Sequence, residues 1–389
     1  MKKKASRRLT AAFTMAAMLV TLMPSGAAFA APAEESGEAT QATAVAAKTA
    51  PKEVAGDTQE AGKNQYVSYE WDYDQEQLVR SVKDIPDYAT VVTQDNINDV
   101  WSNGMIQGGP YVIEGDVTVN GPLTVNGWAS IILKDDSQLN AMQGIRLENR
   151  ALLDIFAQSE KSWNMGKLFA NGAEKYGHGI GGNNAGSIKI FGGSVKATGV
   201  NSPGLGAGNI EIYNGDITAK SNNEAAIGSK SRGNSTNVYI YNGKVHATSD
   251  TCVGIGGGRG SAAGNIMIRN GEITTNGEIG IGIYNGGDIW IKDGVVEATG
   301  KEMAIGTAGY NGHCGDISID GGEVTAIGGD LNGWAGGIGC DDYSICGDVR
   351  ISSGEVTLKN NRGIYVPDFK EVKVTGGSID VGYNSTADI

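Results

Sequence analysis

The sequence predicts an all-β protein whose mature part winds mostly into a right-handed parallel β-helix, with three short strands in each coil. Glycine supplies 60 of the 389 residues, about twice its usual share. Apolar residues alternate with a period of two, which indicates strands and excludes helical repeats. Short apolar elements recur at intervals of 22 to 32 residues, which is too short for a propeller blade of about 40–50 residues.

Three elements make up each repeat. The first is Gly-Ile-Gly, centred on Ile180, Ile255, Ile281 and Ile338, with close variants in other coils. The second is a pair of alternating apolar residues followed by Gly, and the pairs begin at Ile188, Ile210, Val238, Ile266, Ile289, Ile317, Val349 and Val372. The third is Val followed two residues later by Ala, as in Val195 and Ala197. We expect these residues to stack inward, coil on coil.

The N-terminal end carries the features of an export signal. A basic start is followed by an apolar run from Leu9 to Met23 and by the small-x-small site Ala28-Phe29-Ala30. These features predict a signal peptide over residues 1–30 and a mature start at Ala31. The expected location is therefore secreted or cell surface. No later segment is long and apolar enough to span a membrane.

Three further segments follow the predicted cleavage site. Residues 31–64 are nearly free of large apolar side chains, which predicts a disordered linker. Residues 65–110 include the alternating Tyr69, Trp71 and Tyr73 and a possible short helix from Asn96 to Ser102, and we expect them to form an N-terminal cap. A solenoid needs such a cover over its end. Residues 111–389 form the expected β-helix, with two or three degenerate coils before eight explicit ones.

Net charge restricts the class of partner. The chain carries 44 acidic and 31 basic side chains, a formal charge of −13. Phosphate recognition needs a basic face, so this charge argues against a nucleic-acid partner. It is compatible with neutral glycans, or with acidic glycans reached through a bound cation.

One outward column of the predicted coils is aromatic. Phe191, Tyr213 and Tyr241 share a register, with Tyr239 and Trp290 beside them. Exposed aromatic patches usually contact a partner, and flat rings suit the CH faces of sugars, so these five residues are candidate carbohydrate-binding residues. Two alternatives remain open: a ladder of rings stacked only on one another, or rings covered by a loop or by the N-terminal cap.

A second outward column changes from amide to acid along the chain, because Asn residues in the earlier coils give way to Asp288, Asp316 and Asp348. Stacked carboxylates repel unless they are protonated or share a cation, and Ca²⁺ accepts several oxygen ligands with loose geometry. These three Asp are therefore candidate Ca²⁺ ligands. In the alternative, each Asp caps its own turn and faces water.

Four cysteines in a chain expected to be exported permit disulfides. Cys314 and Cys346 share the register Cys-Gly-Asp, which predicts that one lies directly under the other and that they pair. Cys340 with Cys346, closing a single loop, is the competing pair. Zinc is not expected, because the sequence has no close Cys-x-x-Cys pair.

The stretch from Tyr111 to Thr357 resembles a family of Gly-rich repeat surface proteins of gut and anaerobic bacteria. The resemblance lies in the segments IILKDDSQLNAMQGIRL and LLDIFAQSE and in repeats such as GIGGNNAGSIKIFGGSVKATG. Many of these proteins carry the label carbohydrate-binding domain-containing, and the resemblance implies a parallel β-helix that binds glycans. It carries over no catalytic residue.

The favoured function is thus a non-catalytic glycan-binding or adhesion module whose partner is an extracellular glycan or polysaccharide. The alternative is a polysaccharide lyase or glycoside hydrolase, because Lys292 and Arg350 are expected on the same face as the three Asp. Fold analogy alone does not decide between these functions.

Overall fold

The computed structural model describes residues 54–173, 177–262, 264–309, 311–329, 335–360, 362–367 and 370–381. The predicted signal peptide, residues 1–30, lies outside these ranges. So do residues 31–53 of the predicted linker.

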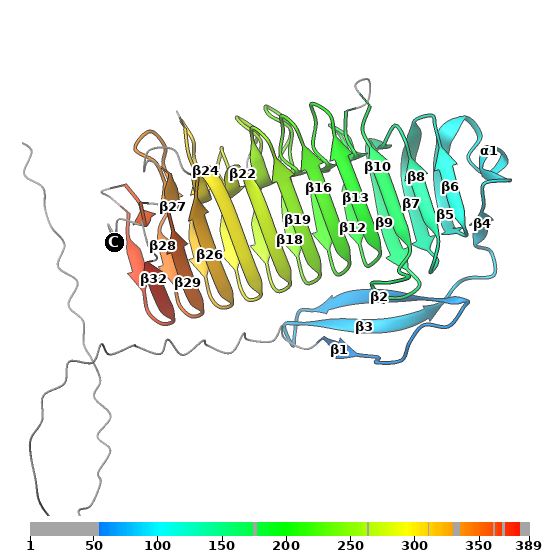
Figure 1. Ribbon diagram of the computed structural model, residues 1–389, viewed down its shortest axis with the longest axis horizontal. Helices are drawn as coiled ribbons and strands as arrows, with labels where there is room; N and C mark the ends of the chain where they lie inside the picture. Colours follow the sequence, from blue (N-terminus) through cyan, green and yellow to red (C-terminus); the bar gives the residue numbers. More distant parts are fainter. Residues whose placement is uncertain are drawn as a thin grey trace, which may run out of the picture. The chain divides into compact units, whose positions relative to one another are not determined.

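The described chain is a parallel β-solenoid of about 12 turns with almost no helix, which confirms the predicted fold class (Figure 1). Its strands stack in three columns. Column A holds the alternating apolar pairs and comprises β4 (Thr90–Val92), the second halves of β5 (Met105–Ile113), β7 (Leu123–Leu133) and β9 (Ile145–Ala157), then β12 (Ser187–Ile190), β15 (Asn209–Ile212), β18 (Asn237–Ile240), β21 (Ile266–Ile268), β23 (Ile289–Ile291), β25 (Ile317–Ile319), β28 (Val349–Ile351) and β31 (Val372–Val374).

Columns B and C complete each coil. Column B holds the Val-x-Ala element: β6 (Asp116–Val119), β8 (Gln138–Ala141), β10 (Lys167–Asn171), β13 (Ser194–Gly199), β16 (Asp216–Ser221), β19 (Lys244–Ser249), the first halves of β22 (Glu272–Gly282) and β24 (Val295–Thr307), β26 (Glu323–Gly328), β29 (Glu355–Lys359) and β32 (Ser378–Val381). Column C holds Gly-Ile-Gly: the first halves of β5, β7 and β9, then β11 (Ile180–Gly181), β14 (Leu205–Gly206), β17 (Ile227–Gly228), β20 (Val253–Gly256), the second halves of β22 and β24, β27 (Gly336–Cys340) and β30 (Ile364–Tyr365).

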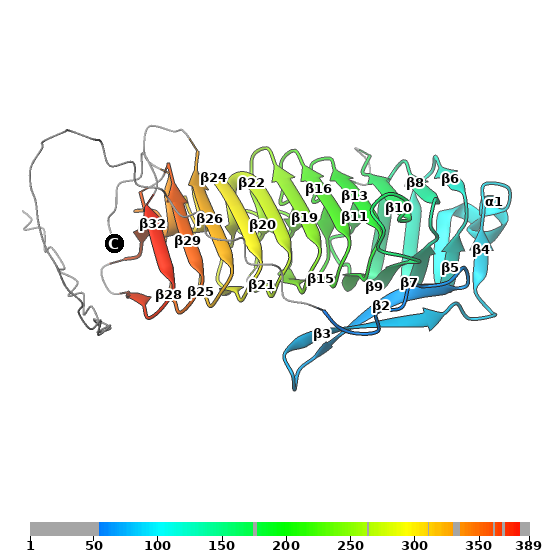
Figure 2. The same cartoon turned by 60° about the horizontal axis from the view of Figure 1, so that its bottom comes forward.

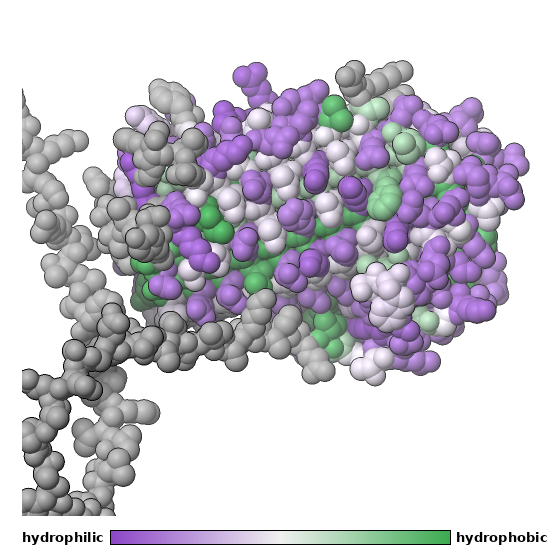
Figure 3. Space-filling model, in the orientation of Figure 1, coloured by the Kyte–Doolittle hydropathy of each residue, from purple (hydrophilic) through white to green (hydrophobic). Residues whose placement is uncertain are grey.

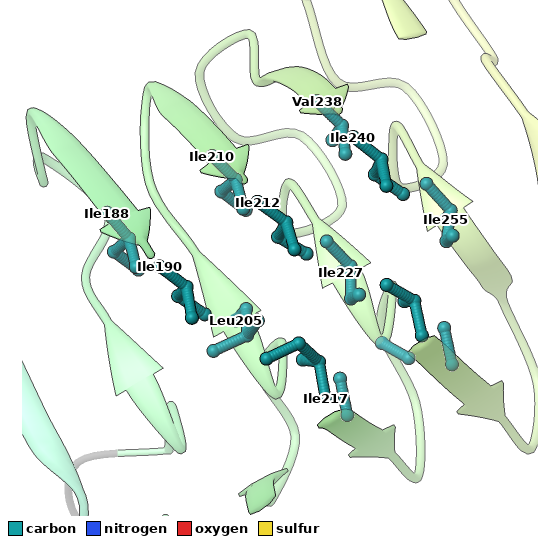
Figure 4. Close-up of a cluster of buried hydrophobic side chains, with 14 of the residues drawn as sticks. Ile188, Ile190, Leu205, Ile210, Ile212, Ile217, Ile227, Val238, Ile240 and Ile255 are labelled. Carbon is teal, nitrogen blue, oxygen red and sulfur yellow. The ribbon is translucent and has the colours of Figure 1, made fainter. Parts of the chain in front are cut away.

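The strand register confirms the repeats read from the sequence. Ile188 pairs with Ile210, and Ile210 with Val238, in parallel. Their side chains fill the space that the coils enclose (Figure 4). Each of the three is fully shielded from solvent. The outer surface is mostly hydrophilic or neutral, and apolar residues show only in narrow strips on the face drawn in Figure 3.

The second glycine of Gly-Ile-Gly is required by the spacing between coils. Gly228 has φ +144°, and a β-carbon there would collide with the carbonyl oxygen of Gly256 in the next coil. Residues other than Gly rarely adopt this backbone conformation. The same collision recurs along column C, at Gly181, Gly256, Gly306 and Gly339.

The N-terminal segment forms a hairpin along the side of the solenoid (Figure 2). Strands β2 (Gln65–Asp72) and β3 (Gln77–Asp84) pair antiparallel, and β1 (Ala55–Gly56) pairs in parallel with β3. Strand β2 also reaches β9, through Val67 and Ala157. Residues 54–64, expected at the end of a linker, therefore include a strand that belongs to this hairpin layer.

A different segment covers the end of the solenoid. Helix α1 (Ile97–Val100) and the 3₁₀ turn η1 (Ser102–Gly104) occupy the region expected to be helical. Ile97 and Trp101 are 3% and 2% exposed and pack into the solenoid core. The cover thus comes from the later part of residues 65–110, and the parallel pairing of the solenoid begins at β4, ahead of Tyr111. No helix within the described ranges is long and apolar enough to cross a membrane.

Candidate functional site

The aromatic column forms the stack expected from its register. Neighbouring ring centroids lie 4.7 Å apart for Phe191 and Tyr213, and 4.6 Å apart for Tyr213 and Tyr241. Phe156 extends the stack by one coil, with its ring 4.4 Å from that of Phe191. Sequence reasoning missed Phe156, although it ends an apolar alternation in the register of Phe191.

The stack does not form the open platform that we expected from the sequence. Tyr213 and Tyr241 are 8% and 7% exposed, in one apolar cluster with Tyr69 and Leu78 of the hairpin. The hydroxyl of Tyr69 accepts a hydrogen bond from Asn214 Nδ2 at 2.7 Å. The second alternative, rings covered by the N-terminal segment, therefore describes these two residues.

Burial also changes the chemistry of the stack. The Tyr213 hydroxyl donates to Glu211 Oε2 at 2.7 Å. Burial, and then the contact with the Glu211 carboxylate, raises the pKa of Tyr213 well above its usual range. Since the ionised form is disfavoured, Tyr213 acts as a neutral packing residue and hydrogen-bond donor.

Tyr239 and Trp290 keep part of their surface open. They lie on the outer face of column A, separated by Met267 in direct register. All three are half-buried. Of the five aromatic candidates, only Tyr213 and Tyr241 are buried. Phe191 is half-buried like Tyr239 and Trp290, and both Phe191 and Tyr239 pack against the cluster that contains the hairpin residues.

The covered stack opens into a cleft at its C-terminal end. The ring of Trp71, from β2, lies 5.3 Å from that of Tyr241. The Arg269 guanidinium lies over both rings, with its carbon 4.1 Å from the Trp71 centroid and 5.9 Å from that of Tyr241. These three residues, with Asn242, Lys292 and Asp320, line a hollow of about 380 Å³. We call it the hairpin cleft.

The hairpin cleft contains donors that lack a protein partner. Trp71 Nε1 and Arg269 Nε are buried and have no hydrogen-bond acceptor among the described residues. Lys292 Nζ is instead engaged, 2.5 Å from Asp320 Oδ2. Burial opposes ionisation of Asp320, but the hydrogen bonds from Lys292 and Ser352 outweigh it and lower its pKa. Buried donors without partners are costly unless a ligand or water binds them.

Trp71 and Arg269 were not among the residues expected at the site. The alternation of Tyr69, Trp71 and Tyr73 was visible in the sequence and indicated a strand. Its docking against Tyr241 was not visible, because the two segments are far apart in the chain. The indole and guanidinium form one site only through this docking.

The acidic column forms a ladder of side chain–backbone hydrogen bonds. The N–H of Asp316 donates to Asp288 Oδ1, and that of Asp348 donates to Asp316 Oδ1, both at 2.9 Å. In the same way, the N–H of Asp288 donates to Asn265 Oδ1 at 3.0 Å. Asn and Asp are thus interchangeable at this step, since either offers an oxygen to the next coil.

Arg350 supplies the positive charge between two of these carboxylates. Its guanidinium nitrogens lie 2.6 Å from Asp316 Oδ2 and 2.7 Å from Asp348 Oδ2. Burial opposes ionisation of Asp316, but the bonds from Arg350 and from the backbone of Asp348 prevail and lower its pKa. Within the described ranges, no group of three or more His, Cys, Asp or Glu side chains is arranged to hold a metal ion. The Ca²⁺ site stays a prediction, and an ion there would have to displace Arg350.

The cysteines meet in a different pair from the one first expected. Cys314 and Cys346 lie in the same register on neighbouring coils, as the pairing of His313 with Ile345 shows. The Sγ atom of Cys346, however, lies 2.6 Å from that of Cys340, and both residues are buried. The competing pair of the sequence analysis is therefore the one that the fold brings together, because the loop 341–345 returns Cys346 beside β27. All four thiols are free in the structure.

Comparison with known proteins supports the repeat. The beta helix repeat family model matches residues 188–209, 238–259 and 317–342. Each match begins in column A: the first two within β12 and β18, and the third at the first residue of β25. Neither a curated protein nor a solved structure matches the chain. The chain is therefore similar to the beta helix repeat family over three of its coils.

Proposed function

We propose that this protein is an exported, non-catalytic glycan-binding module, secreted or held at the cell surface, and that a sugar residue occupies the hairpin cleft. The observation that carries the proposal is the combination of rings and donors without protein partners in one hollow. Ligand sites typically join apolar and aromatic walls to a few convergent polar groups. The predicted signal peptide supports export.

Each wall of the hairpin cleft matches one part of a sugar. Trp71 offers an apolar wall for the CH groups of a pyranose ring, and its buried indole N–H has no acceptor among the described residues. Asn242 presents an amide that can donate to one hydroxyl and accept from another. The Arg269 guanidinium lies over the Trp71 and Tyr241 rings, so little side-chain freedom is lost when it binds an oxygen.

A matched pair of Trp variants tests the site. Trp71→Ala should weaken retention on an insoluble polysaccharide panel at least tenfold, whereas Trp163→Ala should not, because Trp163 is 75% exposed elsewhere. Asn242→Ala provides a second test that leaves the hairpin anchor in place, and the melting temperature of each variant reports folding. Unchanged retention in both Trp71→Ala and Asn242→Ala would remove the hairpin cleft from the proposal.

The same incubations separate binding from catalysis. A glycoside hydrolase needs two carboxylates at a set separation across the bond. Three carboxylates line the hairpin cleft, those of Glu76, Asp293 and Asp320. Asp320 is engaged by Lys292 and Ser352, and Asp293 Oδ1 accepts the N–H of Gly294. We expect no new reducing ends with any polysaccharide, with or without Ca²⁺. Release of reducing ends or of unsaturated products would favour a hydrolase or a lyase instead.

A further inference from the structure

A second hollow lies at the corner between columns C and A. Two adjoining cavities of about 540 and 550 Å³ share residues and run across successive coils. Their common lining is Asn149, His178, Gly182, Asn183, Asn184 and Lys230. We call this the corner groove. It shares no lining residue with the hairpin cleft.

The corner groove is basic in a chain of net charge −13. Arg146, Arg150 and Lys230 line it, and Glu148 is the one carboxylate among its lining residues. Arg146 and Glu148 lie 3.0 Å apart and offset each other. Arg150, at a bend within β9, and Lys230, on the loop after β17, remain as the net positive charge. A cation pair of this kind attracts anions against the overall field of the chain.

The backbone at Arg150 is held in an unusual conformation. Asn149 and Arg150 have φ of +52° and +61°, the left-handed region that residues other than Gly rarely adopt. The N–H of Arg150 donates to the carbonyl of Asn184 at 2.8 Å, which fixes this bend. Strained residues of this kind gather at functional sites. Here the bend places an exposed Arg on the groove.

The loop that carries Lys230 is also fixed. The backbone N–H and the hydroxyl of Ser231 each donate to Glu224 Oε2 at 2.6 Å, and Glu224 is buried. Asn234 Nδ2 donates to the carbonyl of Asn183 at 3.0 Å and so ties this loop to the opposite wall. The groove is thus preorganised, which lowers the entropic cost of binding.

The floor of the groove is shaped by one close approach. His178 is 8% exposed, and a β-carbon on Gly206 would lie 2.8 Å from its Cδ2 atom. A residue with a β-carbon at position 206 would therefore have to displace the imidazole. Amide side chains stand at the rim, from Asn149 and Asn183, both exposed.

We propose that the corner groove binds an extended polyanionic glycan, with uronate or sulfate groups on Arg150 and Lys230 and hydroxyls on the rim amides. Arg suits such groups because its planar guanidinium donates two parallel hydrogen bonds to an oxyanion. The groove spans several coils, so it fits a polymer rather than a single sugar. The proposal is independent of the hairpin cleft.

The test compares the intact protein with two charge-matched double variants. The probes are polygalacturonate, dextran sulfate and neutral dextran, with binding measured at low and at physiological salt. Arg150→Gln with Lys230→Gln should weaken binding to polygalacturonate or dextran sulfate at least tenfold. Lys196→Gln with Lys220→Gln removes the same charge from exposed positions of column B and should leave binding within twofold. Melting temperatures check that each variant folds.

The remaining outcomes decide the ligand. Loss with polygalacturonate assigns carboxylates, and loss with dextran sulfate assigns sulfates. Equal weakening in both double variants would show a non-specific charge effect and overturn the site. The site would also be overturned if the intact protein bound neither polygalacturonate nor dextran sulfate. A DNA oligonucleotide that binds with the same variant dependence would overturn the glycan class. Trp71→Ala should keep full polyanion binding, so failure of the hairpin cleft would not imitate failure here.

Discussion

Replacing Asp316 by Ala should destabilise the C-terminal coils by removing one step of the acidic ladder. Asp316 Oδ1 accepts the N–H of Asp348 at 2.9 Å, and that N–H has no second acceptor among the residues that the structure describes. Ala leaves the N–H without its partner, because a methyl group accepts nothing. The coil that begins with β28 loses a bond that ties it to the previous coil.

The size of this effect follows from the hydrogen bond. A typical intramolecular hydrogen bond contributes about 1 kcal/mol net, and more when the orphaned group is shielded from water. The ion pair with Arg350 adds little, since the side chains are 46% and 39% exposed. We therefore expect Asp316→Ala to lower the free energy of unfolding by about 1 kcal/mol, or somewhat more.

Asp316→Asn is the matched control. Asn keeps the oxygen that accepts the Asp348 N–H, as Asn265 does for Asp288. It loses only the contact of the carboxylate with Arg350. Because the pKa of Asp316 is lowered in the folded state, its charge stabilises above the unfolded-state pKa of about 3.9. That contribution is lost as pH falls through the folded pKa. Wild type and Asp316→Asn should therefore converge in acid.

Urea titration at pH 7 and at pH 3, with and without millimolar Ca²⁺, measures these differences. The expected order of midpoints at pH 7 is wild type close to Asp316→Asn, with Asp316→Ala lower. Asn as damaging as Ala would refute the ladder, since the acceptor would then not matter. A Ca²⁺-dependent gain in stability that Asp316→Asn abolishes would support the Ca²⁺ site instead, because ligands stabilise the state that they bind.

Two further predictions concern the coils and the thiols. Gly228→Ala should lower the free energy of unfolding by several kcal/mol (roughly 3 or more), because the β-carbon collides with the next coil and the φ angle is strained. The control Gly121→Ala has open space around its β-carbon and should leave the melting temperature nearly unchanged. Similar melting temperatures for the two variants would contradict the packing argument. In protein secreted into an oxidising medium, where a dithiol oxidoreductase or O₂ accepts the electrons, peptide mapping should find a Cys340–Cys346 disulfide. A Cys314–Cys346 disulfide would show instead that the shared register of neighbouring coils decides the pairing.

The repeat was readable from the sequence because each coil repeats the same local requirement. An inward Ile or Val every second residue fills the core, and Gly follows where the coils approach closely. Ile227 and Gly228 show both requirements in neighbouring positions, since one is fully buried and the other tolerates no β-carbon. Parallel stacking then fixes which residues share a column. The aromatic stack and the Asn-to-Asp ladder could therefore be predicted as columns.

The burial of those columns was decided by tertiary structure alone. Tyr69 and Asn214 meet across 145 residues of sequence, and no local pattern records that contact. The hairpin turns Tyr213 and Tyr241 from surface rings into packed ones and adds Trp71 to the cleft that remains. Likewise, Arg150 and Lys230 line one groove although they are far apart in sequence, because the stacking of the coils brings the bend of β9 and the loop after β17 to the same corner. Coil composition determines the solenoid, whereas long-range docking and loop geometry determine which of its surfaces can bind.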